Sequence, residues 1–204
     1  MIRTDLELED VVAAYERAGA RALSVLTEGV GFGGMLEDLG RARAAATLPI
    51  LRKDFVVDEY QVVEAVAGGA DAILLIVAAL DPAELRSLNE RATGYGLGVL
   101  MEVHDGGELA IAAAVEPAVI GINNRDLTTL EVDPARTFEL LASVPAGALT
   151  VSESGLRSPE DVAAVAAAGV DAVLVGEALM RSADIESACR ELVGAAATAP
   201  TMDR

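Results

Sequence analysis

The chain has 204 residues, and its 15 Lys and Arg against 33 Asp and Glu give a formal net charge of −18. This charge excludes a general nucleic-acid partner, because affinity for phosphates depends on clustered Lys and Arg. The longest apolar run, residues 72–80, is far shorter than the ~20 residues of a membrane-spanning helix, so we expect no membrane partner.

Composition also bounds the domain organisation. With 52% hydrophobic residues the chain can bury a real core, and domains of this length are usually single. We predict one domain over residues 1–197 and a short tail over residues 198–204. Cys189 is the single cysteine and can form no internal disulfide, which favours a cytoplasmic location.

Predicted helices and strands alternate along the whole chain. The first helix is expected to start between residues 7 and 10, where apolar residues begin to recur at helical spacing. An alanine-rich stretch that ends at glycine, followed by a short apolar run, recurs at residues 18–26, 68–76 and 168–176. This repeat predicts a helix closed by glycine and then a strand buried on both faces. Together with weaker copies, it predicts strands at about residues 22, 49, 72, 97, 118, 148 and 172.

A helix in every gap between strands predicts parallel strands joined by right-handed crossovers. Two architectures compete, a doubly wound open sheet and a closed (β/α)8 barrel. The loop over residues 27–34 has four glycines, as a dinucleotide-binding sheet would, but no acidic residue closes a second strand ~20 residues later. Polar residues instead gather past the ends of several strands, which favours the barrel. We predict an α/β fold, a (β/α)8 TIM barrel shortened at the N-terminus.

The seven predicted strands are one fewer than a barrel needs. Residues 2–4 are a candidate for a short stub of strand. Without such a stub, the gap between the first and last strands leaves unpaired edge groups. We then expect self-association, or a complementing fragment, at the open edge.

Charged residues at predicted strand ends are the first candidates for catalysis. Lys53 is the only lysine and directly follows a strand, where an ammonium can donate a proton or hold an anion; the alternative is an ordinary surface lysine. Glu102 ends an apolar strand, where desolvation suits a general acid or base; a compatible alternative is a partner for Lys53 or Arg125. The single histidine, His104, is interpreted as a residue at the start of a helix rather than as a catalyst.

Small residues follow two of the predicted strands, at Ser152–Gly155 and at residues 175–178. Backbone amides of such turns bind phosphate in barrels, which explains how a chain of charge −18 could hold an anionic substrate.

A capping signature at residues 158–161 predicts the start of the next helix, and apolar spacing predicts a last helix over residues 181–197. One cysteine and one histidine far apart make no zinc site, and no paired carboxylates argue for Mg²⁺, so no metal is expected.

Five segments carry ordered motifs: residues 48–62, 102–105, 121–127, 151–155 and 175–180. The first contains the run Leu-Arg-Lys-Asp-Phe. Together they closely resemble indole-3-glycerol phosphate synthase of tryptophan biosynthesis, over about residues 8 to 194. The resemblance implies closure of the pyrrole ring of 1-(2-carboxyphenylamino)-1-deoxyribulose 5-phosphate, with loss of CO₂ and water. It implies a phosphorylated small-molecule substrate and no cofactor.

The resemblance also implies roles for individual residues. Lys53 would protonate the ribulose carbonyl as the aromatic carbon attacks, Glu102 would be the general base of the later dehydration, and Asn123 would orient the hydroxyls. Glu153 and Ser154 would line the site near the anthranilate ring and the ribulose chain. The phosphate end matches four residues: Arg125, Gly155, Gly176 and the amide of Glu177. The aromatic ring would pack on five side chains: Phe32, Phe55, Leu75, Leu127 and Leu174.

The chain departs from the family's pattern in two places. Family members begin with an additional helical segment and a first strand ending in Glu-x-Lys-x-x-Ser, which are not found here, and Gly31 and Met35 replace an aromatic residue and a serine. We therefore expect impaired turnover, because each lost preorganised contact typically costs ~10²–10³ in rate. Two alternatives stay open: another phosphosugar barrel enzyme, and a catalytically inactive scaffold or fragment.

Overall fold

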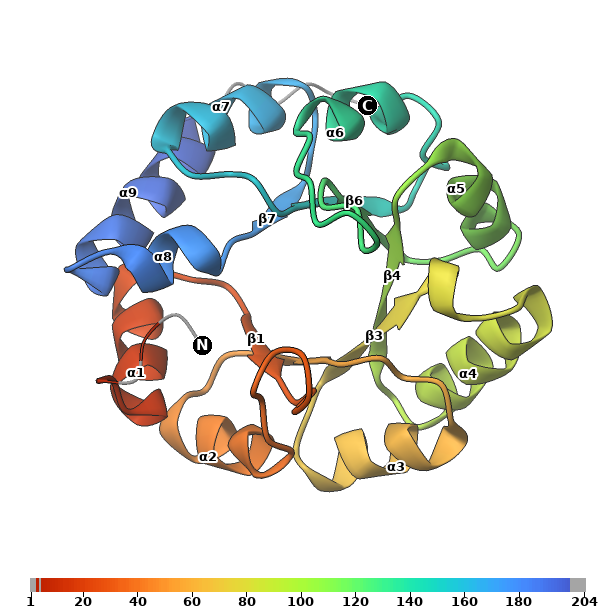
Figure 1. Cartoon of the computed structure of the whole chain (residues 1–204), viewed down its shortest axis with the longest axis horizontal. Helices are drawn as coiled ribbons and strands as arrows, with labels where there is room; N and C mark the ends of the chain where they lie inside the picture. The colour runs from red at the N-terminus through yellow and green to blue at the C-terminus, as the bar shows by residue number, and fades with distance from the viewer. Residues whose placement is uncertain (1–2, 4, 199–204) are drawn as a thin grey trace. The chain divides into compact units, whose positions relative to one another are not determined.

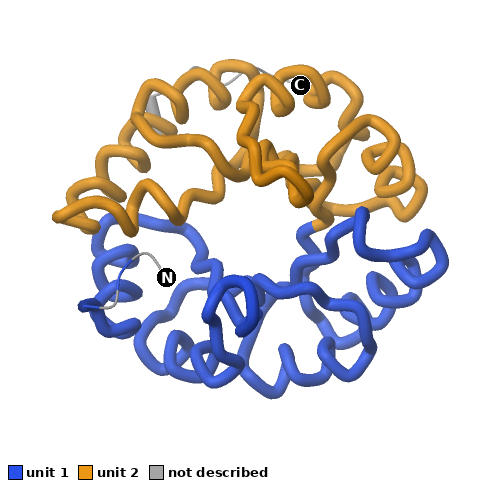
Figure 2. Tube along the Cα trace, viewed as in Figure 1, with its two compact units in different colours: residues 1–100 blue, residues 101–204 orange. Residues whose placement is uncertain are grey.

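A computed structural model describes residue 3 and residues 5–198. The predicted stub at residues 2–4 and the predicted tail fall outside these residues, apart from Arg3 and Thr198. The chain forms two compact units, residues 1–100 and residues 101–204, which Figure 2 draws in blue and orange. Each unit is built from alternating helices and strands (Figure 1).

The first unit contains the elements up to the start of β4. In chain order these are α1 (Leu8–Ala18), β1 (Leu23–Leu26), α2 (Glu37–Ala45), β2 (Ile50–Lys53), α3 (Glu59–Ala67), β3 (Ala72–Ile76), the 3₁₀ turn η1 (Val77–Ala79), α4 (Pro82–Gly94) and the beginning of β4 (Gly98–Val103). The helix α2 packs on β1 and β2, and α4 packs on β3.

The second unit contains the remainder of β4 and the elements that follow it. These are α5 (Gly106–Ala113), β5 (Val119–Asn123), α6 (Ala135–Leu141), β6 (Leu149–Glu153), α7 (Pro159–Ala167), β7 (Ala172–Leu174), α8 (Glu177–Arg181) and α9 (Ile185–Thr198). The helix α9 packs against α7 and α8.

Strand pairing is parallel in both units, and the strand order follows the chain. In the first unit β1 pairs with β2 and β2 with β3; in the second, β5 pairs with β6 and β6 with β7. The register places Leu26 opposite Lys53, and Glu153 opposite both Asn123 and Leu174. The carboxyl ends of neighbouring strands are therefore level, which brings the polar residues at those ends together.

The sequence repeat explains how two of the strands, β2 and β6, are held near their starts. Three repeat glycines, Gly19, Gly69 and Gly169, adopt left-handed backbone angles of 94°, 85° and 100° in φ, which end the preceding helix. The aspartate of the repeat then binds the previous strand: a carboxylate oxygen of Asp71 accepts the backbone N–H of Ile50 over 2.8 Å, and one of Asp171 accepts that of Thr150 over 2.8 Å. These contacts confirm that the repeat marks a helix, a tight turn and a strand.

The core of the first unit is aliphatic. Its fully buried side chains include Leu39, Ile50, Ile73, Leu75 and Leu85, contributed by both helices and strands. Burial of one such side chain typically contributes ~1.5–3 kcal/mol, which makes these residues the main source of stability. In the described part of the chain, no helix combines the length and apolar character that crossing a bilayer requires.

The predicted start of the last helix is wrong. Instead of one helix over residues 181–197, the short α8 ends at Arg181 and α9 begins at Ile185. Asp184 explains the break, because its Oδ1 accepts the backbone N–H of Ser187 over 2.9 Å and so caps α9. The capping signature at Ser158 is confirmed, since its side chain accepts the N–H of Asp161 and starts α7.

Candidate active site

The sole lysine lies between two residues whose side chains are fixed on one face of β2. The guanidinium of Arg52, 3% exposed, binds Oδ2 of Asp54 over 3.0 Å and Oε2 of Glu64 over 3.3 Å. It also donates to the carbonyl of Gln61 over 2.6 Å. Because successive side chains of a strand point to opposite faces, Lys53 lies on the face opposite Arg52. In the run Arg-Lys-Asp, the two outer residues thus bind each other on one face of β2, and the lysine between them is directed to the other face.

The glycine-rich loop after β1 uses its backbone amides internally. The carboxylate of Glu28 accepts the N–H groups of Val30, Gly31 and Phe32 over 2.8, 2.7 and 2.9 Å. These amides therefore bind a carboxylate of the same loop, in contrast to a dinucleotide-binding turn, whose amides face a pyrophosphate. The arrangement leaves Phe32 53% exposed at the end of β1.

In the second unit, Glu102 and His104 are neighbours at the end of β4. Glu102 is 1% exposed, and its Oε1 lies 3.3 Å from Nε2 of His104. The Nδ1 of the same ring lies 3.0 Å from Oε2 of Glu108 on α5. His104 does precede a helix, as predicted, but its contact with Glu102 was not predicted. The sequence did contain a signal for this contact, because residues two apart on a strand point to the same face.

The amide of Asn123 is oriented by two hydrogen bonds at the end of β5. Its Oδ1 accepts the hydroxyl of Ser154 over 2.8 Å and the backbone N–H of Arg125 over 3.0 Å. Since Oδ1 is occupied by donors, this network assigns the Nδ2 group as the part of the amide that can donate to a ligand. Arg136 of α6 supports the same strand end, because it donates to the carbonyl of Asn123 over 3.0 Å.

A fully buried polar network lies behind this amide, and its role was not predicted from the sequence. Oδ1 of Asn124 accepts the hydroxyl of Thr137 over 2.9 Å, and its Nδ2 donates to the carbonyl of Ser154 over 3.0 Å. The hydroxyls of Thr137 and Ser152 are 2.8 Å apart. Buried networks of this kind rigidify their surroundings when every member is bonded. Asn124 therefore couples the ends of β5 and β6 to α6.

The turn after β6 has an unusual backbone. Ser154 and Gly155 both adopt positive φ angles, 63° and 80°. A Cβ at position 155 would lie 2.6 Å from Cγ1 of Val132, so glycine is required there. The loop after β5 therefore packs directly on this turn.

Arg125 and Glu177 meet from distant parts of the second unit. The guanidinium of Arg125 binds the carboxylate of Glu177 over 3.0 Å, and Arg181 binds the same carboxylate over 3.1 Å. Hydrogen bonding to Arg181 and the charges of both arginines lower the pKa of Glu177. The partner of Arg125 seen here is thus Glu177, on α8.

The apolar residues of the candidate site differ in exposure. Phe55 and Leu127 are partly exposed, at 39% and 36%. Leu75 is fully buried within β3, and Leu174 is half-buried in β7. Gly176 lies at the start of α8. The structure thus brings Asn123, Glu153, Ser154, Gly155, Arg125 and Glu177 together in one unit, while Lys53, Phe32, Phe55 and Leu75 belong to the other.

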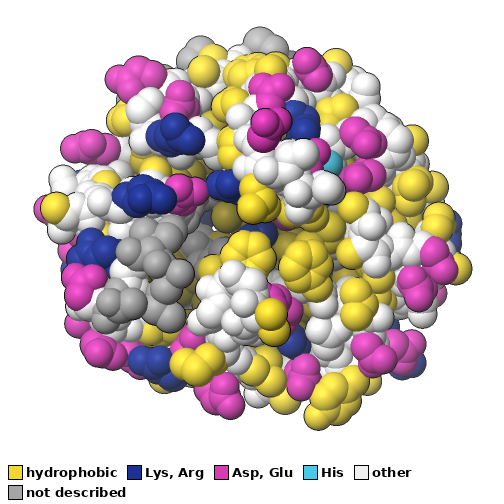
Figure 3. All heavy atoms as spheres, in the orientation of Figure 1, with side chains coloured by type: hydrophobic (Ala, Val, Ile, Leu, Met, Phe, Trp, Pro, Cys, Tyr) yellow, Lys and Arg dark blue, Asp and Glu magenta, His cyan; other side chains and the backbone are white. Residues whose placement is uncertain are grey.

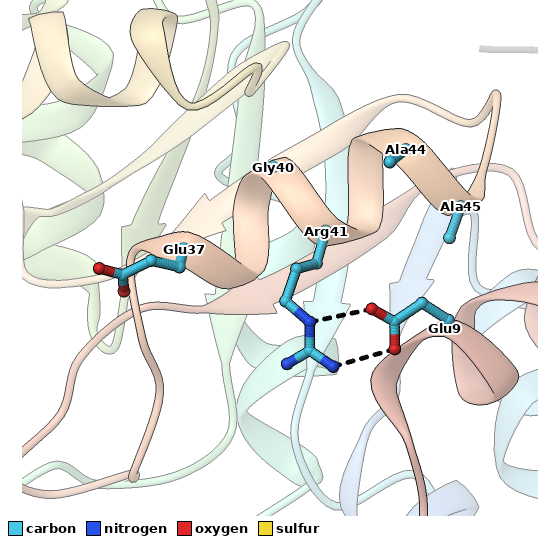
Figure 4. A pocket seen from close by; sticks show the side chains of 6 residues that line it. All are labelled: Glu9, Glu37, Gly40, Arg41, Ala44 and Ala45. Carbon is cyan, nitrogen blue, oxygen red and sulfur yellow. Dashed lines mark hydrogen bonds and ion pairs between the residues drawn. The ribbon is translucent and has the colours of Figure 1, made fainter.

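Away from the strand ends, a shallow groove of about 690 Å³ lies on α1 and α2. Figure 4 shows that two of its charged side chains face each other: Arg41 binds Glu9 through two hydrogen bonds of 2.9 Å, while the third, Glu37, points away. The remaining lining is Gly40, Ala44 and Ala45, which offers little for a ligand to recognise. Among the residues described, no three His, Cys, Asp or Glu side chains are grouped as a metal site.

Acidic side chains are spread over both units on the face drawn in Figure 3, with Lys and Arg interspersed among them. The net charge of −18 therefore produces a field that repels anions at long range. The phosphorylated substrate that the family resemblance implies would have to be bound by short-range groups, such as backbone amides and single arginines.

Comparison with solved structures establishes the fold. The 3-hexulose-6-phosphate synthase of Salmonella typhimurium superimposes with a TM-score of 0.77 at 15% identity, over 96% of each chain. Thiamine phosphate pyrophosphorylase from Pyrococcus furiosus gives a TM-score of 0.72 at 20% identity, over 95% of this chain and 90% of that one. At such low identity these likenesses show fold alone, and they confirm the predicted α/β barrel class over the doubly wound alternative.

Comparison of sequences establishes the family. A family model described as indole-3-glycerol phosphate synthase matches residues 1–192. The indole-3-glycerol phosphate synthase of Aromatoleum aromaticum is 50% identical over 194 residues, 95% of this chain and 74% of the relative. A relative from Streptomyces coelicolor, indole-3-glycerol phosphate synthase 2, is 50% identical over 93% of this chain and 74% of its own length. This chain therefore belongs to the indole-3-glycerol phosphate synthase family, the carboxy-lyases that close the indole ring in tryptophan biosynthesis.

Proposed function

We propose that Lys53 is the general acid and Glu102 the general base with which this chain forms indole-3-glycerol phosphate. The observation that carries the proposal is the fixed pair Arg52 and Asp54, which turns the only lysine to the other face of β2 at its carboxyl end. In the family's fold, catalytic groups lie at the carboxyl ends of strands.

Lys53 serves the first step. As the aromatic carbon attacks the ribulose carbonyl, the oxygen gains negative charge and needs a proton. The ammonium supplies that proton, so the oxygen becomes a hydroxyl, and loss of CO₂ from the same aromatic carbon restores the ring. A cation at this point also stabilises the developing charge before the proton moves.

Glu102 serves the dehydration. The hydroxyl formed in the first step takes up a proton from solvent and leaves as water, and the carboxylate accepts the proton released from carbon as the double bond of the pyrrole ring forms. Its 1% exposure supports this role, because a carboxylate without a hydration shell is a stronger proton acceptor than one in water.

Asn123, Glu153 and Ser154 orient the sugar chain. The Nδ2 group of Asn123 donates to a substrate hydroxyl, and its direction is fixed because Oδ1 accepts from Ser154 and Arg125. Glu153 lies opposite Asn123 in the register of β5 and β6, and it places a second carboxylate beside the amide. Prior fixation of such groups lowers the entropic cost of the reaction.

The phosphate is bound by backbone amides and one arginine. Ser154 and Gly155 both have positive φ angles, and turns with such angles can offer backbone N–H groups to an anion; Gly176 with the Glu177 amide would form the second turn. Arg125 adds a guanidinium, currently bound to Glu177 over 3.0 Å, which a phosphate would compete for. Five apolar side chains are proposed for the anthranilate ring. Phe32, Phe55, Leu127 and Leu174 have exposed surface for it, whereas Leu75 is fully buried and would support the ring site from within β3.

Indole fluorescence tests the proposal directly. The chain contains no tryptophan and three tyrosines, so an indole product is detected against a low background. Incubation with 1-(2-carboxyphenylamino)-1-deoxyribulose 5-phosphate should give a signal that Lys53→Ala lowers by ~10²–10³. Arg21→Ala is the matched control, because it removes a cation that precedes β1, at the opposite strand end. No signal from a folded wild type would favour the inactive scaffold.

We also propose that another chain pairs with an edge strand. Within the described residues, β1 and β7 stand at the two ends of the strand order, and edge strands offer their backbone groups to a second copy or a complementing fragment. Light scattering coupled to size exclusion tests this, and a monomer at every concentration contradicts self-association. A cytoplasmic location is proposed from the single cysteine.

A further inference from the structure

The imidazole of His104 lies between two carboxylates of the second unit. Its Nδ1 is 3.0 Å from Oε2 of Glu108, and its Nε2 is 3.3 Å from Oε1 of Glu102. The side chain of His104 is 10% exposed and that of Glu102 is 1% exposed. Water screens these charges poorly, so their interaction is stronger than that of a surface pair.

Only the charged ring makes both contacts attractive. The contact of Nδ1 with Glu108 is a hydrogen bond, whereas Nε2 makes no hydrogen bond within the described residues, and its 3.3 Å distance from Oε1 of Glu102 is that of an ion pair. Burial lowers the pKa of His104, but the adjacent Glu102 and Glu108 outweigh that effect and raise it to about 9. At neutral pH the ring is therefore a cation between two anions.

Glu108 fixes the place of the ring. Its Oε2 accepts a hydrogen bond from the backbone N–H of His104 over 2.8 Å and lies 3.0 Å from Nδ1 of the ring. The backbone and the ring of His104 are therefore held by the same oxygen. The N–H of Glu108 in turn binds Oδ1 of Asp105, which caps α5. In the described part of the chain, the charged groups that act on His104 are Glu102 from β4 and Glu108 from α5, while Asp105 is engaged at the cap.

We propose that His104 is a positioning residue of the indole-forming reaction, whose imidazolium, anchored by Glu108, holds the Glu102 carboxylate ionised and oriented. The inference rests on the proposed function, because it bears on catalysis only where Glu102 is the general base. Burial alone favours a neutral carboxylic acid, which accepts no proton, whereas an adjacent cation favours the carboxylate. His104 acts through Glu102 in this arrangement.

The first test needs no activity. His104 is the only histidine, so its ring C–H signals are the only imidazole signals in an NMR spectrum of the full chain. A pH titration should give a midpoint near 9, and Glu102→Gln and Glu108→Gln should each lower it. A midpoint of 6.5 that neither variant changes overturns the proposal.

The second test compares pH profiles of indole formation. His104→Gln should move the acid limb of kcat to higher pH and lower kcat at pH 7 by ~10-fold, with little change in KM. The difference from wild type should vanish above pH 9, where the wild-type ring is itself neutral. Asp105→Ala is the matched control, since it removes the α5 cap and leaves both ion pairs of the ring in place. It should lower stability and leave the profile unchanged.

The outcomes separate the two proposals. A rate difference that stays constant with pH, or the same change of profile in Asp105→Ala, means a structural role and overturns the positioning role. A wild type that forms no indole product overturns the proposed function, and the catalytic role of His104 fails with it. In that case the NMR midpoint still decides whether the ion pairs exist in solution.

Discussion

The hydroxyl of Ser154 donates a hydrogen bond of 2.8 Å to Oδ1 of Asn123, and so joins the ends of two neighbouring strands. The second donor to the same oxygen is the backbone N–H of Arg125, which every substitution of Arg125 except proline leaves in place. The hydrogen bond from Ser154 is therefore the one of the two that a conservative substitution can remove. Its effect on activity measures how much orientation of that amide contributes.

Ser154→Ala should lower kcat about 10-fold, because an amide held by one donor in place of two is less well oriented toward the substrate hydroxyls. Steady-state indole formation measures this. Ser152→Ala is the matched control, since it breaks the buried contact with Thr137 and leaves the hydrogen bond to Asn123 in place. A wild-type kcat in Ser154→Ala, or an equal loss in both variants, would contradict the orienting role.

The periodic elements could be predicted from the sequence because their signals are local. The first strand begins at Leu23 where residue 22 was predicted, and the last begins at Ala172 as predicted. Apolar periodicity and helix-ending glycines suffice for this. The break before α9 was missed, because a side chain such as that of Asp184 competes with the helix through hydrogen bonds that apolar spacing does not record.

Contacts between distant residues could not be predicted from spacing. Arg125 and Glu177 are 52 residues apart, and their ion pair follows from the register of β5, β6 and β7. His104 lies two residues from Glu102 and four from Glu108, a pattern that is visible in the sequence. Whether this spacing produces contacts depends on where the strand ends and the helix begins, because one more residue in the turn would point the ring away from the two carboxylates.

Arg52→Met should lower the free energy of unfolding by about 3–5 kcal/mol, because it leaves the partly buried carboxylates of Asp54 and Glu64 without their cation. Urea denaturation measures the change. Arg41→Met is the control: it also removes an arginine with several carboxylate partners, but one whose side chain is 39% exposed and screened by water, so the loss should be much smaller than for Arg52→Met. An equal loss of unfolding free energy in the two variants would show that burial of the Arg52 ion pairs does not increase their contribution to stability.

Gly155→Ala should be destabilising and should raise KM. The new Cβ would meet Val132 at 2.6 Å and would sit on a backbone with φ of 80°, so the proposed phosphate-binding turn must shift. Gly147→Ala is the matched control, since Gly147 has φ of 95° and its new Cβ would have nothing within 4 Å. It should show the cost of backbone strain alone, about 1 kcal/mol, with unchanged KM. A KM in Gly155→Ala equal to that of wild type argues against phosphate at this turn.

The ionisation of His104 should also appear in stability. Its pKa in the folded chain is raised from 6.5 to about 9, so the ion pairs contribute their full stabilisation below pH 6.5 and lose it as pH rises through 9. The free energy of unfolding of wild type should therefore fall relative to His104→Gln across this window, by about 2 kcal/mol once solvent screening is allowed for. Urea denaturation of both proteins at a series of pH values gives the difference.

The comparison with His104→Gln isolates this effect from the other groups that titrate in the same range. Burial raises the pKa of Cys189, whose thiol also makes stability fall at high pH, but this contribution is common to both proteins and cancels in the difference. Glu108→Gln should reduce the pH-dependent difference without abolishing it, since Glu102 still faces the ring at 3.3 Å. A difference between wild type and His104→Gln that is flat from pH 6 to 10 would mean that His104 is neutral in the folded chain at pH 7, and that Glu102 is held without the help of a neighbouring cation at this ring.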